Sequence, residues 1–357
     1  MRCKIETGVL QKMVQRVNPG VGNSKILPVT QYLEVKVQDG ELFLTSTNAS
    51  SFMCANSLVG DWEEGSVLVK ADTFIKLIQR TKTDEVRLTS NSNQLSVHGH
   101  GIYKQALYRD REFPEWEQES LEDLGVIKGK TLKERLKVHE AAVSNTMVRP
   151  EMTGYYIGGD KMVTTDDTRL CVSEIGGVSS VPMLIPGALA ELLYEFDDED
   201  DVRVLRSERA LEFHSEGLKV RGPELLGLDR FPNTEAIESI EYENNWKVAV
   251  AKFQDAVDRV SLFSDPYYSY GVVISVEGNS VYVTDLLNQT RELVTGEGLL
   301  EKDVKLVLNS QHLLGVLSKF SRESDMLFEW NKEEDPVRVG VEGGEELFYL
   351  TTVEVNS

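Results

Sequence analysis

Apolar residues recur along the 357-residue chain with two spacings, one typical of helices and one typical of strands. Leu10, Met13, Val14 and Val17 are three or four residues apart, which places them on one face of a helix. Alternation in LEVKVQDGELFLT, at 33–45, predicts two strands joined by a hairpin turn at Asp39-Gly40. The spacing predicts helices at 7–17, 70–82, 130–145, 186–196, 247–263 and 309–322.

The same order of elements occurs three times. A short strand ends at Thr47, Thr165 and Thr284, which are 118 and 119 residues apart. About twenty residues later an apolar strand runs into a helix, as in SVLVKADTFIKLI, VPMLIPGALAELL and DVKLVLNSQHLLGVL. Phe-Pro pairs at 113–114 and 231–232 repeat the period again. We therefore expect an α+β protein of three tandem homologous domains, each an antiparallel sheet with two helices, at 1–119, 120–240 and 241–357.

Composition narrows the class of protein. A content of 41% apolar residues supports folded cores, and the net charge of −21 opposes binding to nucleic acid or anionic membranes over most of the surface. Cys3, Cys54 and Cys171 are odd in number and far apart, which suits a reducing compartment. No apolar run reaches the roughly 18 residues of a membrane span. We expect a soluble cytoplasmic protein with no membrane partner.

The positive charge is concentrated in the predicted helices. Together the six helices carry +8, which leaves −29 for the rest of the chain. Lys12 with Arg16, Lys76 with Arg80 and Lys133 with Lys137 are spaced four apart, away from the apolar stripes. The helix at 186–196, with Glu191 and Glu195, is the exception. Five basic helices in an acidic chain favour a surface that contacts phosphates without reading bases.

Candidate catalytic and metal-binding groups are sparse. No GxxxxGK[ST] phosphate loop occurs, which disfavours an NTPase. His98 and His100 fit a surface turn, Cys171 a buried apolar position, and Asp166-Asp167 a turn of the repeat. The run FDDEDD at 196–201 fits a solvated loop. We expect no enzyme activity, no cofactor and no metal.

Several motifs resemble the bacterial DNA sliding clamp, the β subunit of replicative DNA polymerase III. TTDDTRLCV at 164–172 is similar to that family's T-D-G-H-R-L-A turn, with Asp167 and Thr168 in place of Gly and His. VPMLIPGALAELL is similar to the entry to its second helix in the middle domain, and KFQDAVDRVSLFS to the first helix of its third domain. EFPEW and RFPNT resemble its inter-domain joints. The resemblance covers essentially the whole chain and suits a divergent or phage-encoded member.

The resemblance implies a homodimeric ring of six domains with helices lining the hole. Such a ring encircles duplex DNA without sequence preference and acts as a processivity factor for DNA replication. It tethers the DNA polymerase through short peptide motifs, and a separate clamp loader that binds in the same way opens it. Residues that the helix charges and the resemblance assign to DNA contact are Lys12, Arg16, Lys25, Lys76, Arg80, Lys82, Lys133, Lys137, Tyr155, Tyr156, Lys252, Lys319 and Arg322.

The resemblance also implies two protein-binding surfaces. The partner-peptide groove would use Thr165, Arg169, Leu170, Pro232, Ile237, Tyr267, Tyr268, Leu350 and Thr352. The dimer interface would pair the region of Tyr103 with Leu262 and Phe263, for which ordinary core packing is an equal alternative. Two departures affect the groove: the family's C-terminal M-P-M-R-L is replaced by TTVEVNS, and usual basic residues become Glu235 and Ala236.

Two other functions remain open from the sequence. An acidic DNA mimic, or decoy, would bind a DNA-handling protein and would show no basic lining. A repeat-built enzyme would need a polar cleft with perturbed carboxylates.

Overall fold

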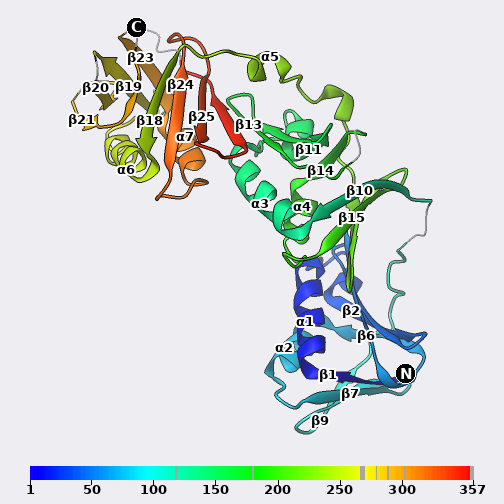
Figure 1. The fold of residues 1–357 in the computed structure, drawn as a ribbon. Helices are drawn as coiled ribbons and strands as arrows, with labels where there is room; N and C mark the ends of the chain where they lie inside the picture. The colour runs from blue at the N-terminus through cyan, green and yellow to red at the C-terminus, as the bar shows by residue number, and fades with distance from the viewer. Residues whose placement is uncertain are drawn as a thin grey trace. The chain divides into compact units, whose positions relative to one another are not determined.

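The computed structural model describes residues 1–116, 120–178, 181–265, 270–278, 280–287, 289–300 and 303–353 (Figure 1). The order of a strand, a long helix, a strand meander, a second helix and further strands occurs three times along the chain. Contacts divide the chain into two compact units, the first mainly residues 1–133 and 185–224, the second mainly 134–176 and 225–353. The two boundaries between the three predicted domains stay a prediction.

Residues 1–116 contain the helices α1 (Thr7–Val17) and α2 (Ala71–Arg80) and the short 3-10 helices η1 (Asn18–Gly20) and η2 (Pro28–Gln31). Their strands are β1 (Arg2–Glu6), β2 (Tyr32–Gln38), β3 (Glu41–Thr47), β4 (Phe52–Leu58), β5 (Gly60–Glu63), β6 (Gly65–Lys70), β7 (Glu85–Ser90), β8 (Gln94–His98) and β9 (Ile102–Ala106).

The middle of the chain contains α3 (Gly129–His139), α4 (Gly187–Leu193), α5 (Glu235–Glu238), η3 (Glu140–Ala142), η4 (Pro150–Thr153) and η5 (Leu228–Arg230). Its strands are β10 (Glu122–Lys128), β11 (Gly154–Gly158), β12 (Lys161–Thr165), β13 (Arg169–Glu174), β14 (Met183–Pro186), β15 (Asp201–Arg206), β16 (Ala210–Ser215) and β17 (Leu218–Pro223).

The last third contains α6 (Val250–Ser261) and α7 (Ser310–Leu317). Its strands are β18 (Asn244–Ala249), β19 (Gly271–Glu277), β20 (Ser280–Asp285), β21 (Arg291–Val294), β22 (Glu297–Leu299), β23 (Val304–Asn309), β24 (Asp325–Trp330), β25 (Val337–Val341) and β26 (Glu346–Leu350). The predicted α+β class and the six predicted helices are confirmed, with ends that differ by a few residues.

Antiparallel sheets cross the boundaries between the predicted domains. In the first unit, the eight-stranded sheet runs β10-β15-β16-β17-β4-β3-β2-β6, so that β17 joins β4. In the second unit, the nine-stranded sheet runs β14-β11-β12-β13-β26-β25-β24-β18-β22, so that β13 joins β26. The five-stranded sheet β5-β1-β7-β8-β9 and the four-stranded sheet β21-β20-β19-β23 complete the units.

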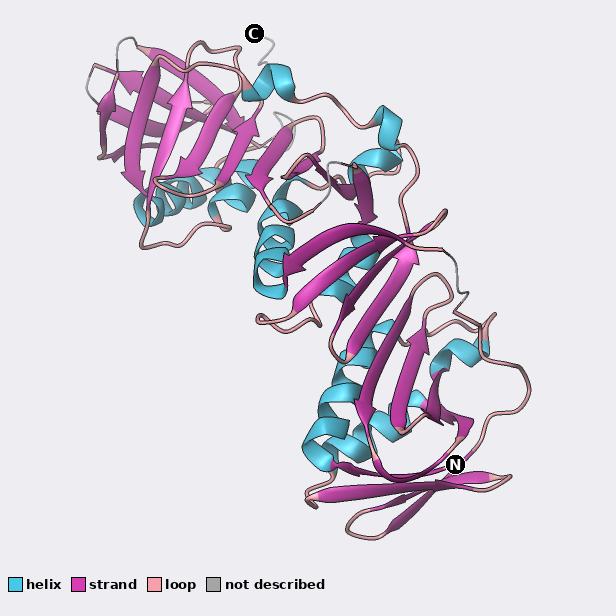
Figure 2. Cartoon of the chain, turned by 45° about the vertical axis from the view of Figure 1, so that its right-hand side comes forward, coloured by secondary structure: helices cyan, strands magenta, loops and turns pink. Residues whose placement is uncertain are grey.

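Helices pack on one face of these sheets and bury the residues that the spacing indicated. In the first unit, α1 lies beside α2 and against β3 and β4 (Figure 1). Leu10, Met13, Val14 and Val17 of α1 are all buried, as predicted. In the second unit, α6 packs on α7 (Figure 2). The core beneath them includes Phe253, whose ring meets that of Trp246 edge-on at 5.3 Å.

The predicted hairpin at Asp39-Gly40 is confirmed. Strands β2 and β3 are joined by these two residues, whose φ angles are +51° and +79°. Positive φ at both positions is what a type I′ turn needs, and it explains why Asp and Gly stand there.

Candidate functional site

Five of the cations assigned to DNA are exposed and form no ion pair with any residue that the structure describes. These are Lys25, Arg80, Lys82, Lys137 and Lys252. Arg80 ends α2, Lys82 follows it, Lys137 is on α3 and Lys252 is on α6. The basic character of the helices is therefore available to solvent at these positions, which the decoy hypothesis does not expect.

Other assigned cations are held by carboxylates of the same chain. Exposed Lys76 pairs with Asp72 at 2.5 Å, and Arg322 pairs with Asp255 at 2.7 Å. Lys319, largely covered, donates to Glu140 at 2.8 Å. Lys12 and Lys133 pair with Asp197 and Asp198. Such pairs contribute little to stability at an exposed surface, but they reduce the charge offered to phosphate.

Two assignments to DNA need correction because the side chains are buried. Arg16 is 7% exposed, and its guanidinium donates to Asp197 at 2.6 Å. Tyr155 is 6% exposed. Neither side chain offers a surface to a duplex in this structure. The helix spacing placed Arg16 away from the apolar stripe correctly, but it carries no information on carboxylates far along the chain.

A second candidate surface is a cluster of apolar and aromatic side chains on the nine-stranded sheet. Its buried members are Val163, Leu170, Val172 and Tyr349, and Tyr156, Phe231, Ile237, Tyr242 and Leu347 pack on them while partly exposed. We call these nine residues the aromatic patch. Tyr156 and Phe231 stack with ring centroids 4.8 Å apart. Partly exposed aromatic and aliphatic side chains around buried ones suit an anchor residue of a peptide.

The polar edge of the aromatic patch is ordered by ion pairs. Lys161 donates to Glu238 at 2.7 Å, and that hydrogen bond raises the pKa of Lys161. Burial of Glu238 opposes its ionisation, but the bonds from Lys161 and Thr234 lower its pKa overall. The guanidinium of Arg338 lies 4.8 Å from the ring centre of Tyr242, whose pKa burial raises to about 12. Both carboxylate and phenol therefore keep one protonation state near neutral pH.

The structure brings together part of the predicted peptide groove. Leu170 and Ile237 belong to the aromatic patch, and Pro232 follows its member Phe231. Thr165 is buried and donates to the Arg169 carbonyl at 2.8 Å, while the Arg169 side chain pairs with Asp166. Leu350 is instead part of the core under α6 and α7. Thr352 is half-buried after β26, and Tyr267 and Tyr268 lie outside the described residues.

The sequence missed most of the aromatic patch. Tyr156 was assigned to DNA, yet its ring packs on Phe231, 75 residues away. Tyr349 and Tyr242 were assigned no function, although the Tyr242 hydroxyl donates to the Pro336 carbonyl at 3.1 Å. The available signal is that adjacent residues of a strand, here Tyr155 and Tyr156, face opposite ways.

The exposed apolar residues assigned to the dimer interface lie on an edge strand of the first unit and directly after a helix of the second. Tyr103 is 45% exposed on β9, which ends the five-stranded sheet, next to Ile102 at 63%. Leu262 and Phe263 follow α6 and are 80% and 58% exposed. The alternative of core packing is wrong for these three within the single chain. Leu293, on the edge strand β21, is 53% exposed and was not assigned.

Buried polar groups tie α3 to the strands of the second unit. Nδ1 of His139 is 3.1 Å from the Thr164 hydroxyl, and Nε2 is 2.8 Å from the Ser173 hydroxyl. Burial, reinforced by the charge of Arg135, lowers the pKa of His139 to about 3, so the ring is neutral at physiological pH. Arg135 itself bonds Glu345 and Glu346 at the start of β26. These contacts hold α3 against strands β12, β13 and β26 and do not form a catalytic site.

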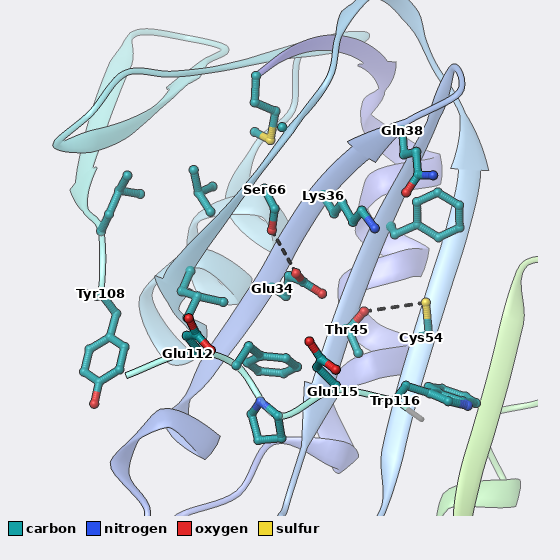
Figure 3. Close-up of a pocket in the computed structure, with 18 of the residues that line it drawn as sticks. Glu34, Lys36, Gln38, Thr45, Cys54, Ser66, Tyr108, Glu112, Glu115 and Trp116 are labelled. Carbon is teal, nitrogen blue, oxygen red and sulfur yellow. Dashed lines mark hydrogen bonds between the residues drawn. The ribbon is translucent and has the colours of Figure 1, made fainter. Parts of the chain in front are cut away.

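A cavity of about 1390 Å³ lies on the face of the eight-stranded sheet that carries Glu34, Lys36 and Thr45, under the chain at 107–116 (Figure 3). The Trp116 indole donates to Glu212 at 3.2 Å and its ring packs on Phe52, which holds that chain against the sheet. The Cys54 thiol in the cavity is 3.6 Å from the Thr45 hydroxyl, and burial raises its pKa. A thiol that stays protonated is a poor nucleophile.

The other candidate groups lie as the sequence indicated. His98 ends β8, and His100 Nε2 accepts from the backbone of Lys82 at 3.1 Å. Cys171 is fully buried. Asp166 accepts from the backbone of Thr168 and Arg169 in a turn. Across the described residues no three His, Cys, Asp or Glu side chains gather to hold a metal, and no helix is long and apolar enough to cross a membrane.

Comparison with known proteins agrees with this arrangement. Residues 1–116 match the family described as DNA polymerase III beta subunit, N-terminal domain. A beta sliding clamp of Staphylococcus aureus is 23% identical over 319 residues, which cover 83% of this chain and 84% of that protein. The solved sliding clamp of Pseudomonas aeruginosa superposes with a TM-score of 0.89 at 17% identity, covering 99% of this chain and all of that one.

The sliding clamp of Bacillus subtilis superposes with a TM-score of 0.86 at 16% identity, covering both chains completely. The resemblance that the sequence indicated is thus confirmed: the chain matches the DNA polymerase III beta subunit over residues 1–116 and has the fold of the bacterial DNA sliding clamps over its whole length.

Proposed function

We propose that this chain is a cytoplasmic DNA sliding clamp without catalytic activity. Two copies would close into a ring of six domains that encircles duplex DNA and tethers the replicative polymerase and other partners. The full-length fold likeness and the exposed cations on the helices support this proposal. Processivity would come from topology, because a closed ring cannot leave a circular duplex and needs no tight contact with it.

The observation that carries the proposal is a pair of open strand edges that match the two internal sheet junctions. Strand β17 is the last of the four-strand series β10-β15-β16-β17, and β26 is the last of the series β18-β24-β25-β26. The first strand of each series directly precedes a long helix. At the two internal junctions, β17 pairs with β4 and β26 pairs with β13. Strand β9 ends the equivalent series in residues 1–116. Strand β21 follows the repeated threonine strand as β4 and β13 do. We infer that β9 of one copy pairs with β21 of the other.

The internal junctions also give the register of this pairing. Within the three series of paired strands, Tyr103 of β9 takes the same place as Val220 of β17 and Phe348 of β26. At the internal junctions, Val220 pairs with Met53 and Phe348 pairs with Cys171. The residue of β21 equivalent to Met53 and Cys171 is Glu292, opposite Val283. Tyr103 is therefore expected opposite Glu292.

One residue to either side, the register sets Ile102 opposite Leu293 and Lys104 opposite Arg291. The first of these pairs would cover two exposed apolar side chains that otherwise face water.

The helix side of the junction supports the same closure. Counted from the first helical residue, Leu262 and Phe263 after α6 correspond to Ala141 and Ala142 after α3. Ala141 and Ala142 are 7% and 0% exposed in the core shared with α7. Leu262 and Phe263 are larger than these alanines and are exposed in the single chain, which fits a contact with a second copy.

Retention on DNA tests the proposed function. Rings assembled in the presence of nicked circular duplex should co-elute with the circle and be lost when it is linearised, because a ring slides off free ends. Arg80→Glu with Lys137→Glu should lower the affinity for a short duplex by roughly tenfold per lost phosphate contact at 0.1 M salt.

The matched control is Lys219→Glu with Lys305→Glu, which reverses two exposed cations on strands β17 and β23. It should leave the affinity close to wild type. Equal retention on linear and circular DNA would refute the ring.

The aromatic patch is proposed to receive the aliphatic or aromatic anchor of polymerase and loader tails. Ile237→Ala removes a partly exposed member and should weaken binding of a synthetic tail peptide by about tenfold to thirtyfold, as for a moderate hot spot. Fluorescence polarisation measures the affinity. Ile240→Ala, three residues on and outside the patch, should bind like wild type. Unaltered affinity in Ile237→Ala would exclude this surface.

A further inference from the structure

An acidic loop of the first unit occupies cations that the helices would otherwise present to DNA. Residues 197–200, of sequence DDED and here called the acidic loop, connect α4 to β15. Asp197 accepts hydrogen bonds from Lys12 and from Arg16 of α1, the latter at 2.6 Å. Asp198 pairs with Lys133 of α3 at 2.5 Å. Three cations from two helices are thus neutralised by one loop.

The backbone fixes the acidic loop in this place. The first two amides of α3, Gly129 and Lys130, donate to the carbonyls of Asp200 and Asp198 at 2.8 and 3.0 Å. A Cβ atom on Gly129 would lie 2.0 Å from the Asp197 carbonyl oxygen, so only glycine lets the loop approach the helix. The Asp200 carboxylate accepts from the Ser215 hydroxyl and the Asp197 amide, both at 3.0 Å. Backbone hydrogen bonds therefore hold the acidic loop beside the start of α3, independently of the ion pairs formed by its side chains.

The electrostatics keep the acidic loop ionised. Partial burial opposes ionisation of Asp197, but the bond from Lys12 and the charges of Arg16 and Lys133 lower its pKa overall. Neighbouring Glu195 shows the opposite balance, since burial raises its pKa despite Arg16 and Lys133. Asp197 is therefore a permanent anion beside these cations at neutral pH.

The other two repeats have no such acidic loop. The segment after α2, at 81–84, contains Lys82 and Asp84, and the segment after α7, at 318–324, contains Lys319, Arg322 and Glu323. The equivalent segment after α4 has four consecutive carboxylates and no cation. Only the middle repeat thus has a run of carboxylates after its second helix, where the other two repeats have cations mixed with a single carboxylate.

We propose that the acidic loop is an internal substitute for DNA phosphates, which competes with the duplex for Lys12 and Lys133 and so weakens the hold of the ring. This inference rests on the proposed function. A clamp must slide, and a carboxylate that occupies a lysine removes a phosphate contact without removing the lysine. The loop thereby sets how strongly, and with what salt dependence, this part of the surface binds DNA.

The test is the salt dependence of duplex binding by the full chain. Asp197→Asn with Asp198→Asn should release Lys12 and Lys133, while Asp200 is kept because it bonds the backbone. With two added phosphate contacts, the slope of log K against log salt should steepen by about two, at roughly 0.9 per contact. Fluorescence anisotropy of a labelled duplex between 50 and 200 mM salt measures the slope.

Two further variants separate release of the lysines from a general loss of negative charge. Glu191→Gln with Glu199→Gln removes two exposed carboxylates of α4 and the same loop and should leave the slope unchanged. Lys12→Gln with Lys133→Gln removes the two lysines themselves. Added to the Asp197 and Asp198 substitutions, it should abolish their gain.

An Asp197/Asp198 variant that keeps its thermal unfolding temperature and has the wild-type slope would overturn the inference and leave the clamp function intact. Retention of the wild type on linear and circular DNA alike would instead refute the clamp function, and the inference with it.

Discussion

Leu262→Asp combined with Phe263→Asp is expected to raise the dissociation constant of the dimer by about a thousandfold. Each side chain should act as an interface hot spot of about 2 kcal/mol, and 4 kcal/mol corresponds to a factor of about 1,000. The exposed positions of both residues, against the buried Ala141 and Ala142 at the equivalent junction, are the reason for this size. A concentration series by analytical ultracentrifugation measures the constant.

The control is Ile26→Asp with Leu226→Asp. These residues are 90% and 83% exposed, so the control changes the same kinds of side chain on surfaces outside the proposed junction. The control should stay dimeric. A wild-type chain that is monomeric at micromolar concentration would count against the ring itself, whereas a double variant at positions 262 and 263 that stays dimeric would remove these residues from the interface.

Loss of the dimer should also abolish retention on circular DNA. A monomer presents the same cations on α2 and α3 but cannot enclose a duplex, so the Leu262/Phe263 variant should be lost from nicked circles as readily as from linear DNA. Its affinity for a short duplex at low salt should change far less, because Arg80 and Lys137 are untouched. This contrast separates topological retention from electrostatic attraction.

The elements of this fold were predictable because their signals are local. The spacing of Leu10, Met13, Val14 and Val17 is a property of one helix, and all four are buried. The hairpin at Asp39-Gly40 is set by two adjacent residues with positive φ. The threefold repeat strengthens these predictions, because the same order of strands and helices occurs twice more along the chain.

The surfaces were predictable only in part, because they depend on residues far apart in sequence. Arg16 was placed on the correct face of α1, but the carboxylate that covers it, Asp197, is 181 residues away. Tyr156 and Phe231 stack from separate segments, so neither pattern indicated the aromatic patch. The run FDDEDD was predicted correctly as a loop and incorrectly as wholly solvated, since Asp200 is largely covered and bonds Ser215.

The edge strands β9 and β21 depend both on local sequence patterns and on pairing between distant segments. The exposed Ile102 on β9 looks like an ordinary surface residue until the ladders at β17 and β26 are known. The repeat then supplies a partner strand and a register, neither of which the spacing of apolar residues contains.

The register makes the second large prediction. Ile102→Cys with Leu293→Cys, in a Cys54→Ser background, should form disulfides between copies in high yield on mild oxidation, because directly opposed residues of an antiparallel pair bring Cα atoms within bonding range. Of the native cysteines, Cys3 and Cys171 are buried and should not interfere. Non-reducing electrophoresis should show a covalent dimer, and reduction should return the monomer band.

A shift of one residue supplies the control, because adjacent side chains of a strand point to opposite faces of the sheet. Tyr103→Cys with Leu293→Cys should cross-link poorly for this reason, although both cysteines lie on the same two strands. Efficient cross-linking of the shifted pair and not of Ile102 with Leu293 would show a dimer with another register. Cross-linking of the predicted pair on circular DNA should make the ring resistant to a 1 M salt wash until the disulfide is reduced, since salt weakens contacts with phosphate and leaves a covalently closed ring threaded on its circle.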